Sequence, residues 1–168
     1  MSPNNITLIK GLMLAPKYIV DIATDGMSAL KLIKQHEYDV ILLDVMLPKM
    51  SGYEVCKKLR EDYSLYELPI LLMTAKSRAD DIVTGFLTGA NDYIIKPYDR
   101  YEILSRVGTL ITLKKAVRDV FTLNNEMLEN RKEAIFKLGE VAEKRSKETG
   151  NHVKRVSEYS CFLAKIYG

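Results

Sequence analysis

The chain has 168 residues, of which 47% are hydrophobic and 28% charged, and its formal net charge is +3. This composition is typical of a globular protein, and so small a net charge gives no reason to expect a partner nucleic acid. The cysteines, Cys56 and Cys161, show no metal-type spacing and are typical of reduced thiols. No segment approaches the roughly 18 apolar residues of a membrane span, and the first residues, MSPNNITLIK, lack a charged stretch followed by a long apolar run. We therefore expect a cytoplasmic protein that binds neither membrane nor nucleic acid.

Short apolar segments and helix-period segments alternate through the first 100 residues. Residues 18–25 show an alternating pattern that predicts an edge strand. Three continuous apolar runs predict strands buried on both faces of a parallel sheet, at 38–44, 68–74 and 91–97. Helices are predicted between them at 27–36, 52–62 and 79–89, after the candidate capping residues Asp25, Ser51 and Ser77. This alternation predicts an open α/β fold whose binding site lies beyond the carboxyl ends of the strands.

An acid, a hydroxyl and an amine come at the ends of the three continuous strands: Asp44, Thr74 and Lys96. A carboxylate can attack a phosphoryl group, and the transfer needs a divalent cation, an ammonium group and a hydroxyl or backbone N–H around the phosphoryl oxygens. Taken singly, Asp44 could form a turn, Thr74 could be an ordinary strand residue, and Lys96 could be a solvated strand end. Their joint occurrence favours a phosphoryl-transfer site.

Residues 4 to about 112 resemble the receiver domain of two-component response regulators, a flavodoxin-like (CheY-like) α/β fold. The resemblance rests on DVILLDVMLPKMSGYEV, LLMTAK and DYIIKP, and on Thr74 and Lys96 following Asp44 by 30 and 52 residues. It implies that Asp44 accepts phosphate from a sensor histidine kinase and that the backbone carbonyl of Met46 joins a Mg²⁺ shell. It also implies that Thr74 and Lys96 bind the phosphoryl group, that Tyr93 is the switch aromatic moving with Thr74, and that the bond before Pro97 is cis.

The sequence departs from this family at its front. A receiver begins with an apolar strand ending in two acidic residues that hold magnesium, and Met1 falls where that pair would just have ended. We expect a parallel sheet lacking its first strand, a chain that begins at an internal methionine, and weak Mg²⁺ binding by Asp44 and the Met46 carbonyl. The missing strand would be the central one of the sheet. Three outcomes are therefore open: the second strand pairs directly with the third, a neighbouring chain fills the gap, or the region is disordered.

A different pattern follows the receiver domain, which we assign to residues 1–112. From Arg100 to about Lys147 there is no proline. A heptad repeat predicts a helical coiled-coil linker over residues 113–147 and a homodimer. Its two seam positions are occupied by Leu110, Val117, Asn124, Arg131 and Leu138, and by Leu113, Val120, Met127, Ala134 and Val141. The alternative is one helix lying on its own domain. The polar Asn124 and Arg131 weaken the apolar seam, although one buried Asn can also fix its register.

The last part, residues 148–168, reads as the beginning of a further domain. RSKETGNHVKRV resembles the start of the HD-GYP family of cyclic-di-GMP phosphodiesterases, from which Ser146 departs because an Asp is usual there. The resemblance implies that Glu148 and His152 belong to a metal site, with Fe or Mn expected only in a full-length output domain. The two residues alone do not make a metal site, and within this chain they could equally be surface residues.

These observations favour the front part of a response regulator: a phospho-accepting receiver that controls a cyclic-di-GMP phosphodiesterase in the full-length protein. We expect no enzyme activity from the 168 residues themselves. The alternative is a dimerisation or scaffolding module that works without phosphorylation. A DNA-binding output is disfavoured, since nothing after Asp99 predicts a helix-turn-helix with a basic recognition helix.

Overall fold

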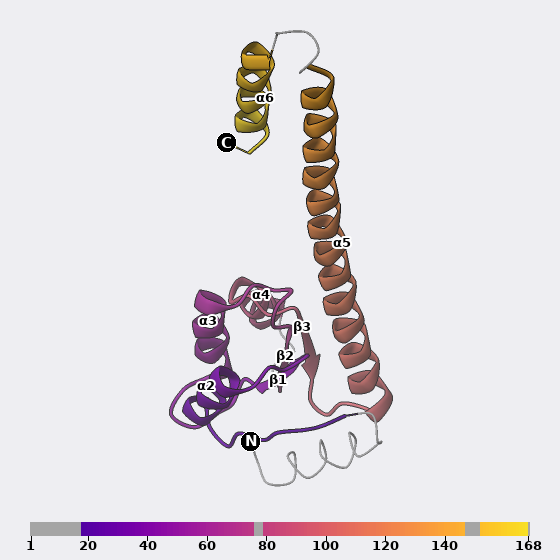
Figure 1. The fold of residues 1–168 in the computed structure, drawn as a ribbon. Helices are drawn as coiled ribbons and strands as arrows, with labels where there is room; N and C mark the ends of the chain where they lie inside the picture. Colours follow the sequence, from indigo (N-terminus) through magenta and orange to yellow (C-terminus); the bar gives the residue numbers. More distant parts are fainter. Residues whose placement is uncertain (1–17, 76–78, 147–151, 168) are drawn as a thin grey trace. The chain divides into compact units, whose positions relative to one another are not determined.

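A computed structural model describes residues 18–75, 79–146 and 152–167 of the chain (Figure 1). Its elements follow one another as α2 (Gly26–Gln35), β1 (Ile41–Asp44), α3 (Gly52–Asp62), β2 (Ile70–Thr74), α4 (Ala79–Leu87), β3 (Asp92–Ile95), α5 (Arg100–Ser146) and α6 (His152–Tyr167). The chain divides into two compact units, residues 1–118 and 119–168. Helix α5 passes without a break through the boundary expected at residue 112.

Three parallel strands form the sheet of the first unit, in the order β1-β2-β3. Alternate residues of β2 enter two different cores, since successive strand side chains point to opposite faces. Leu72 packs on one face with residues of α2 and α3, such as Ile33 and Val55, and Leu71 packs on the other with Ile103 and Val107 of α5. Both faces of the sheet are therefore covered, as the continuous apolar runs predict.

The edge strand expected at residues 18–25 is not formed. Residues 18–23 have no regular structure, although the Tyr38 hydroxyl donates a hydrogen bond to Asp21 at 2.9 Å. A strand requires a neighbour to complete its backbone hydrogen bonds, and in the described sheet β1 pairs only with β2. The second strand has therefore not moved in beside the third.

The helix starts follow local capping chemistry. Asp25 caps α2 and Ser51 caps α3, each in a reciprocal pair with the third helical residue, as predicted. Ser77 lies outside the described residues. The 47 residues of α5 confirm one long helix after the sheet, and within the described part of the chain no helix is apolar over a length that could cross a membrane.

Candidate functional site

The predicted trio lies at one edge of the sheet. Asp44 and Thr74 are the last residues of β1 and β2, and Lys96 directly follows β3. The Lys96 ammonium contacts Oδ2 of Asp44 at 2.6 Å, although 52 residues separate them. Asp44 and Thr74 are only 3% and 4% exposed. The parallel strands thus bring a nearly buried carboxylate and a lysine into direct contact, with the threonine on the strand between them.

Both oxygens of the Asp44 carboxylate are engaged. Oδ1 accepts a hydrogen bond from the backbone N–H of Met46 at 3.0 Å, and Oδ2 accepts the bond from Lys96. The Met46 side chain itself is exposed. Hydrogen bonds of this kind fix the direction of the carboxylate.

Gly52 lets helix α3 approach the carboxylate closely. Its N–H donates to the carbonyl of Val45 at 3.0 Å, and a Cβ at this position would lie 2.3 Å from the Asp44 carbonyl oxygen. Any other residue would push the start of α3 away from the end of β1. Sequence reasoning missed this role, although the glycine directly after the capping Ser51 was the available signal.

Tyr93 lies in β3, where its backbone pairs with Leu72, two residues before Thr74. Its ring stands edge-on to Phe86 of α4, with centroids 5.6 Å apart and planes at 83°. The structure therefore places the expected switch aromatic between the strand that ends in Thr74 and the helix beside it. The bond between Lys96 and Pro97 is cis, as expected.

Magnesium has few protein ligands among the described residues. The predicted ligands are the Asp44 carboxylate and the Met46 carbonyl, and the described residues contain no group of three His, Cys, Asp or Glu that could hold a metal ion. Mg²⁺ prefers six oxygen ligands in near-octahedral geometry. The described donors do not form such a site by themselves.

The output-domain residues are not brought together by the described structure. Glu148 lies outside the described residues, and His152 is the first residue of α6. Their assignment to a metal site stays a prediction.

The model of the response regulator receiver domain matches residues 2–108. The chain belongs to this family. Receiver domains are not catalytic in themselves, are phosphorylated by sensor histidine kinases and typically bind Mg²⁺. The match covers the sheet and the start of α5, so the fold and the family predicted from the sequence are confirmed.

Two curated relatives extend this comparison. A probable cyclic di-GMP phosphodiesterase of Vibrio cholerae is 34% identical over 176 residues, which cover 98% of this chain and 40% of that protein. The response regulator ArlR of Staphylococcus aureus is 40% identical over 107 residues, which cover 64% of this chain and 47% of that protein. The chain therefore spans less than half the length of either relative.

Solved receiver structures share the fold. The receiver domain of the sensor histidine kinase PA1611 from Pseudomonas aeruginosa is 30% identical, with a TM-score of 0.60 over 66% of this chain and 90% of that one. That structure contains a magnesium ion in its active-site cleft. The receiver domain of the Francisella response regulator 1452 is equally similar, at 30% identity and a TM-score of 0.60 over the same shares.

Proposed function

We propose that Asp44 is the phosphoacceptor of this receiver and that phosphorylation controls a cyclic-di-GMP phosphodiesterase in a longer protein. The contact of 2.6 Å between Lys96 and the nearly buried Asp44 carries the first part. The Vibrio cholerae relative, which aligns along 98% of this chain, supports the second. A kinase with a phosphorylated histidine is the proposed partner.

The proposed phosphoryl transfer requires the Lys96 ammonium to exchange one hydrogen-bond acceptor for another. An Asp44 carboxylate oxygen attacks phosphorus, the P–N bond to the kinase histidine breaks, and its electron pair stays on the imidazole nitrogen, which takes up a proton. Lys96 now holds Oδ2 of Asp44, so its ammonium must pass to a phosphoryl oxygen as the acyl phosphate forms. Thr74, on the neighbouring strand end, is the proposed second contact to that group.

Intact mass spectrometry with acetyl phosphate and magnesium tests this assignment. The 168-residue chain gains the mass of one phosphoryl group, the Asp44→Asn variant gains none, and Lys96→Met gains much less. Asp62→Asn is the control because this carboxylate is surface-exposed and pairs only loosely with Lys34, at 3.7 Å. Equal phosphorylation of wild type and Asp44→Asn would exclude Asp44 as the acceptor.

Magnesium binding by this chain is proposed to be weak. Asp44 and the Met46 carbonyl are the described oxygen donors, whereas the receiver of PA1611 holds the ion in its structure. Calorimetric titration of both proteins with Mg²⁺ compares them directly. Equal affinity would show that this chain completes the ligand set with residues outside the described ones.

The proposed switch links Tyr93 to Thr74. When Thr74 turns toward the phosphoryl group, the Tyr93 ring leaves its edge-on contact with Phe86, and the surface of α4 changes with it. Tyr93→Leu should therefore leave phosphorylation intact while abolishing its effect on the output. This variant is measured in a protein that includes the phosphodiesterase domain.

A homodimer through α5 is a second proposal, favoured by the exposed face of this helix. Beyond residue 118 most of its large apolar side chains are exposed, and several occupy the predicted heptad positions: Val120, Met127, Leu138 and Val141. Sedimentation with and without acetyl phosphate separates a phosphorylation-controlled receiver from a scaffolding module. A scaffold dimerises equally in the Asp44→Asn variant, and Met127→Lys dissociates the dimer in either case.

The 168-residue chain is proposed to have no phosphodiesterase activity of its own and to act in the cytoplasm, as response regulators generally do. A purified sample incubated with cyclic di-GMP and either Fe or Mn should release no linear product. Measurable hydrolysis that the His152→Ala variant lacks would overturn this expectation.

A further inference from the structure

Lys114 is a buried lysine on the face of α5 that covers the sheet. Ile103, Val107 and Leu110 of this face are at most 5% exposed and belong to the apolar core. Lys114 continues the same face, because residues three and four apart share one side of a helix, and it is only 8% exposed. Arg118, one turn further, is exposed. Lys114 therefore lies where α5 leaves the core of the first unit.

The ammonium group of Lys114 has one hydrogen-bond partner among the described residues. It donates to the backbone carbonyl of Tyr38 at 2.7 Å, although 76 residues separate the two. No ion pair joins it to a carboxylate of the described residues. Burial lowers the pKa of Lys114, and the charge of Asp39 opposes this effect only in part. An apolar side chain would avoid the cost of burying a charge, so packing alone does not account for a lysine here.

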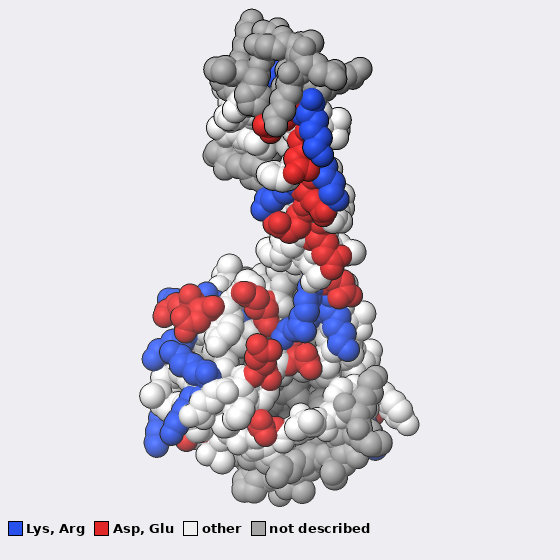
Figure 2. Space-filling model, viewed as in Figure 1, with Lys and Arg blue, Asp and Glu red and all other residues white. Residues whose placement is uncertain are grey.

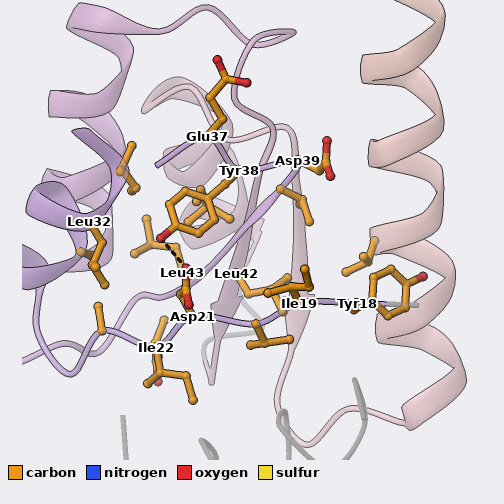
Figure 3. Close-up of a pocket in the computed structure, with 18 of the residues that line it drawn as sticks. Tyr18, Ile19, Asp21, Ile22, Leu32, Glu37, Tyr38, Asp39, Leu42 and Leu43 are labelled. Carbon is orange, nitrogen blue, oxygen red and sulfur yellow. Dashed lines mark hydrogen bonds between the residues drawn. The ribbon is translucent and has the colours of Figure 1, made fainter. Parts of the chain in front are cut away.

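Tyr38 presents its carbonyl from a well-fixed position. It lies between α2 and β1, and its ring packs against the core on the face of the sheet that α2 and α3 cover. Its hydroxyl donates to Asp21 at 2.9 Å beside a cavity of about 490 Å³ (Figure 3). Its ring also stands edge-on to His36, with centroids 6.4 Å apart. The bond from Lys114 therefore ties α5 to a residue that packs on the opposite face of the sheet.

This hydrogen bond fixes what apolar packing restricts only loosely. Apolar contacts are non-directional, whereas a hydrogen bond requires a defined distance and angle and so sets the rotation and the axial position of α5. The ion pair between Arg106 and Asp92 fixes the helix near its start, and Lys114 adds a second fixed point about 12 Å further along. Beyond Lys114 the helix continues to Ser146, over about 48 Å, so a tilt of about 5° moves its far end by about 4 Å.

We propose that Lys114 is a positioning residue that fixes the direction in which α5 leaves the first unit, so that a change in the receiver reaches the rest of the helix. This role rests on the proposed function, in which phosphorylation of Asp44 controls an output domain. Lys114 takes no part in phosphorylation itself, because it contacts the chain before the start of β1, whereas Asp44 ends that strand. Without the contact, the receiver is phosphorylated normally and the output no longer responds.

The contact itself is tested in the 168-residue chain without phosphorylation. NMR of the lysine ammonium groups measures how fast their protons exchange with water, and the exposed Lys115 is the internal control. Exchange at Lys114 should be at least roughly tenfold slower than at Lys115, since its ammonium group is buried and hydrogen-bonded. Equal exchange rates would overturn the proposal, whatever the outcome for Asp44.

The coupling role is tested by Lys114→Met in a protein that includes the phosphodiesterase domain. Methionine keeps an unbranched side chain and removes the donor, and such a replacement of a buried charge is often neutral or stabilising. The melting temperature should therefore be unchanged or higher, and acetyl phosphate should phosphorylate the variant as fully as wild type by intact mass. The ratio of cyclic-di-GMP hydrolysis with and without acetyl phosphate should fall to about 1, whereas Lys115→Met keeps the wild-type ratio.

The outcomes separate a positioning role from a structural one. A Lys114→Met variant that is as stable as wild type and keeps the full response would overturn the proposal, since packing would then suffice. A lower melting temperature together with lost phosphorylation would also overturn it, because Lys114 would then serve the fold of the receiver. If the wild type itself does not respond to phosphorylation, the proposed function fails and the coupling role with it, while ammonium exchange still decides whether the contact exists.

Discussion

The two compact units of this chain differ in how far they bury apolar side chains. In the first unit, Leu72 is 1% exposed between the sheet and two helices, whereas in the second Leu138 is 69% exposed on α5. Figure 2 shows the charged residues that accompany the exposed surface of the second unit. The difference teaches that a sheet gives apolar side chains a core within one chain, whereas a single long helix offers them a stripe that only another surface can cover.

The largest expected effect comes from the same substitution made in both units. Leu72→Ala should lower the free energy of unfolding of the first unit by about 3 kcal/mol, because it leaves a cavity in a closed core. Leu138→Ala should change it by less than about 0.5 kcal/mol, since no core is opened. Urea unfolding followed by tyrosine fluorescence measures both. A large effect of Leu138→Ala would show that the second unit is packed in solution and would break the contrast.

A matched pair of glycines gives the next effect. Gly52→Ala should destabilise the first unit by about 2 kcal/mol or more, because the added carbon lies 2.3 Å from the Asp44 carbonyl. Gly139→Ala in α5 should be neutral or stabilise by up to about 1 kcal/mol, since nothing lies within 4 Å and alanine favours the helix. The measurement is again urea unfolding, with phosphorylation of Gly52→Ala by acetyl phosphate as a second readout. Unchanged stability of Gly52→Ala would contradict the close approach of α3.

Ion pairs should contribute a smaller difference in stability between the two units. Arg106 donates two hydrogen bonds to Asp92, at 2.8 and 3.0 Å, and also pairs with Glu102. The bond that it donates to Asp92 raises the pKa of Arg106. Arg106→Gln should cost about 1 kcal/mol. Lys137→Gln, which removes an exposed pair with Glu133 on α5, should cost about 0.3 kcal/mol. Thermal unfolding at low and high salt checks both, and only the exposed pair should vanish entirely at high salt.

The smallest expected effect is on the pH dependence of stability, through the residue that caps the start of α2. The backbone N–H of Ser28 donates to Asp25 and lowers the pKa of that carboxyl below its ordinary value of 3.8. The cap therefore stabilises the first unit fully above that value, and the contribution is lost as the pH falls through the lower, folded value. Thermal unfolding between pH 5 and 2 should show a slightly flatter profile for Asp25→Asn, which keeps a cap without a charge. An identical profile would mean that the charge of Asp25 contributes nothing.

Local sequence predicts some parts of the fold and of the site, and it does not predict others. Asp25 and Ser51 were predicted as caps because capping depends on residues three apart. The strand at 18–25 was wrongly expected because its alternating pattern says nothing about whether a neighbour pairs with it. Gly52 was missed because its role depends on its distance to the Asp44 carbonyl, which no sequence spacing encodes.

The sequence by itself determined the three paired strands and the helices between them, the family, and the three strand ends at which Asp44, Thr74 and Lys96 stand, since periodicity and spacing are local properties. Only the tertiary structure decided that Lys96 reaches Asp44 across 52 residues and that β1 borders a cavity along an open edge. The physical reason is that strand pairing and packing depend on which segments meet in space. Such contacts between distant segments decide which hydrogen-bonding groups have a partner within the fold.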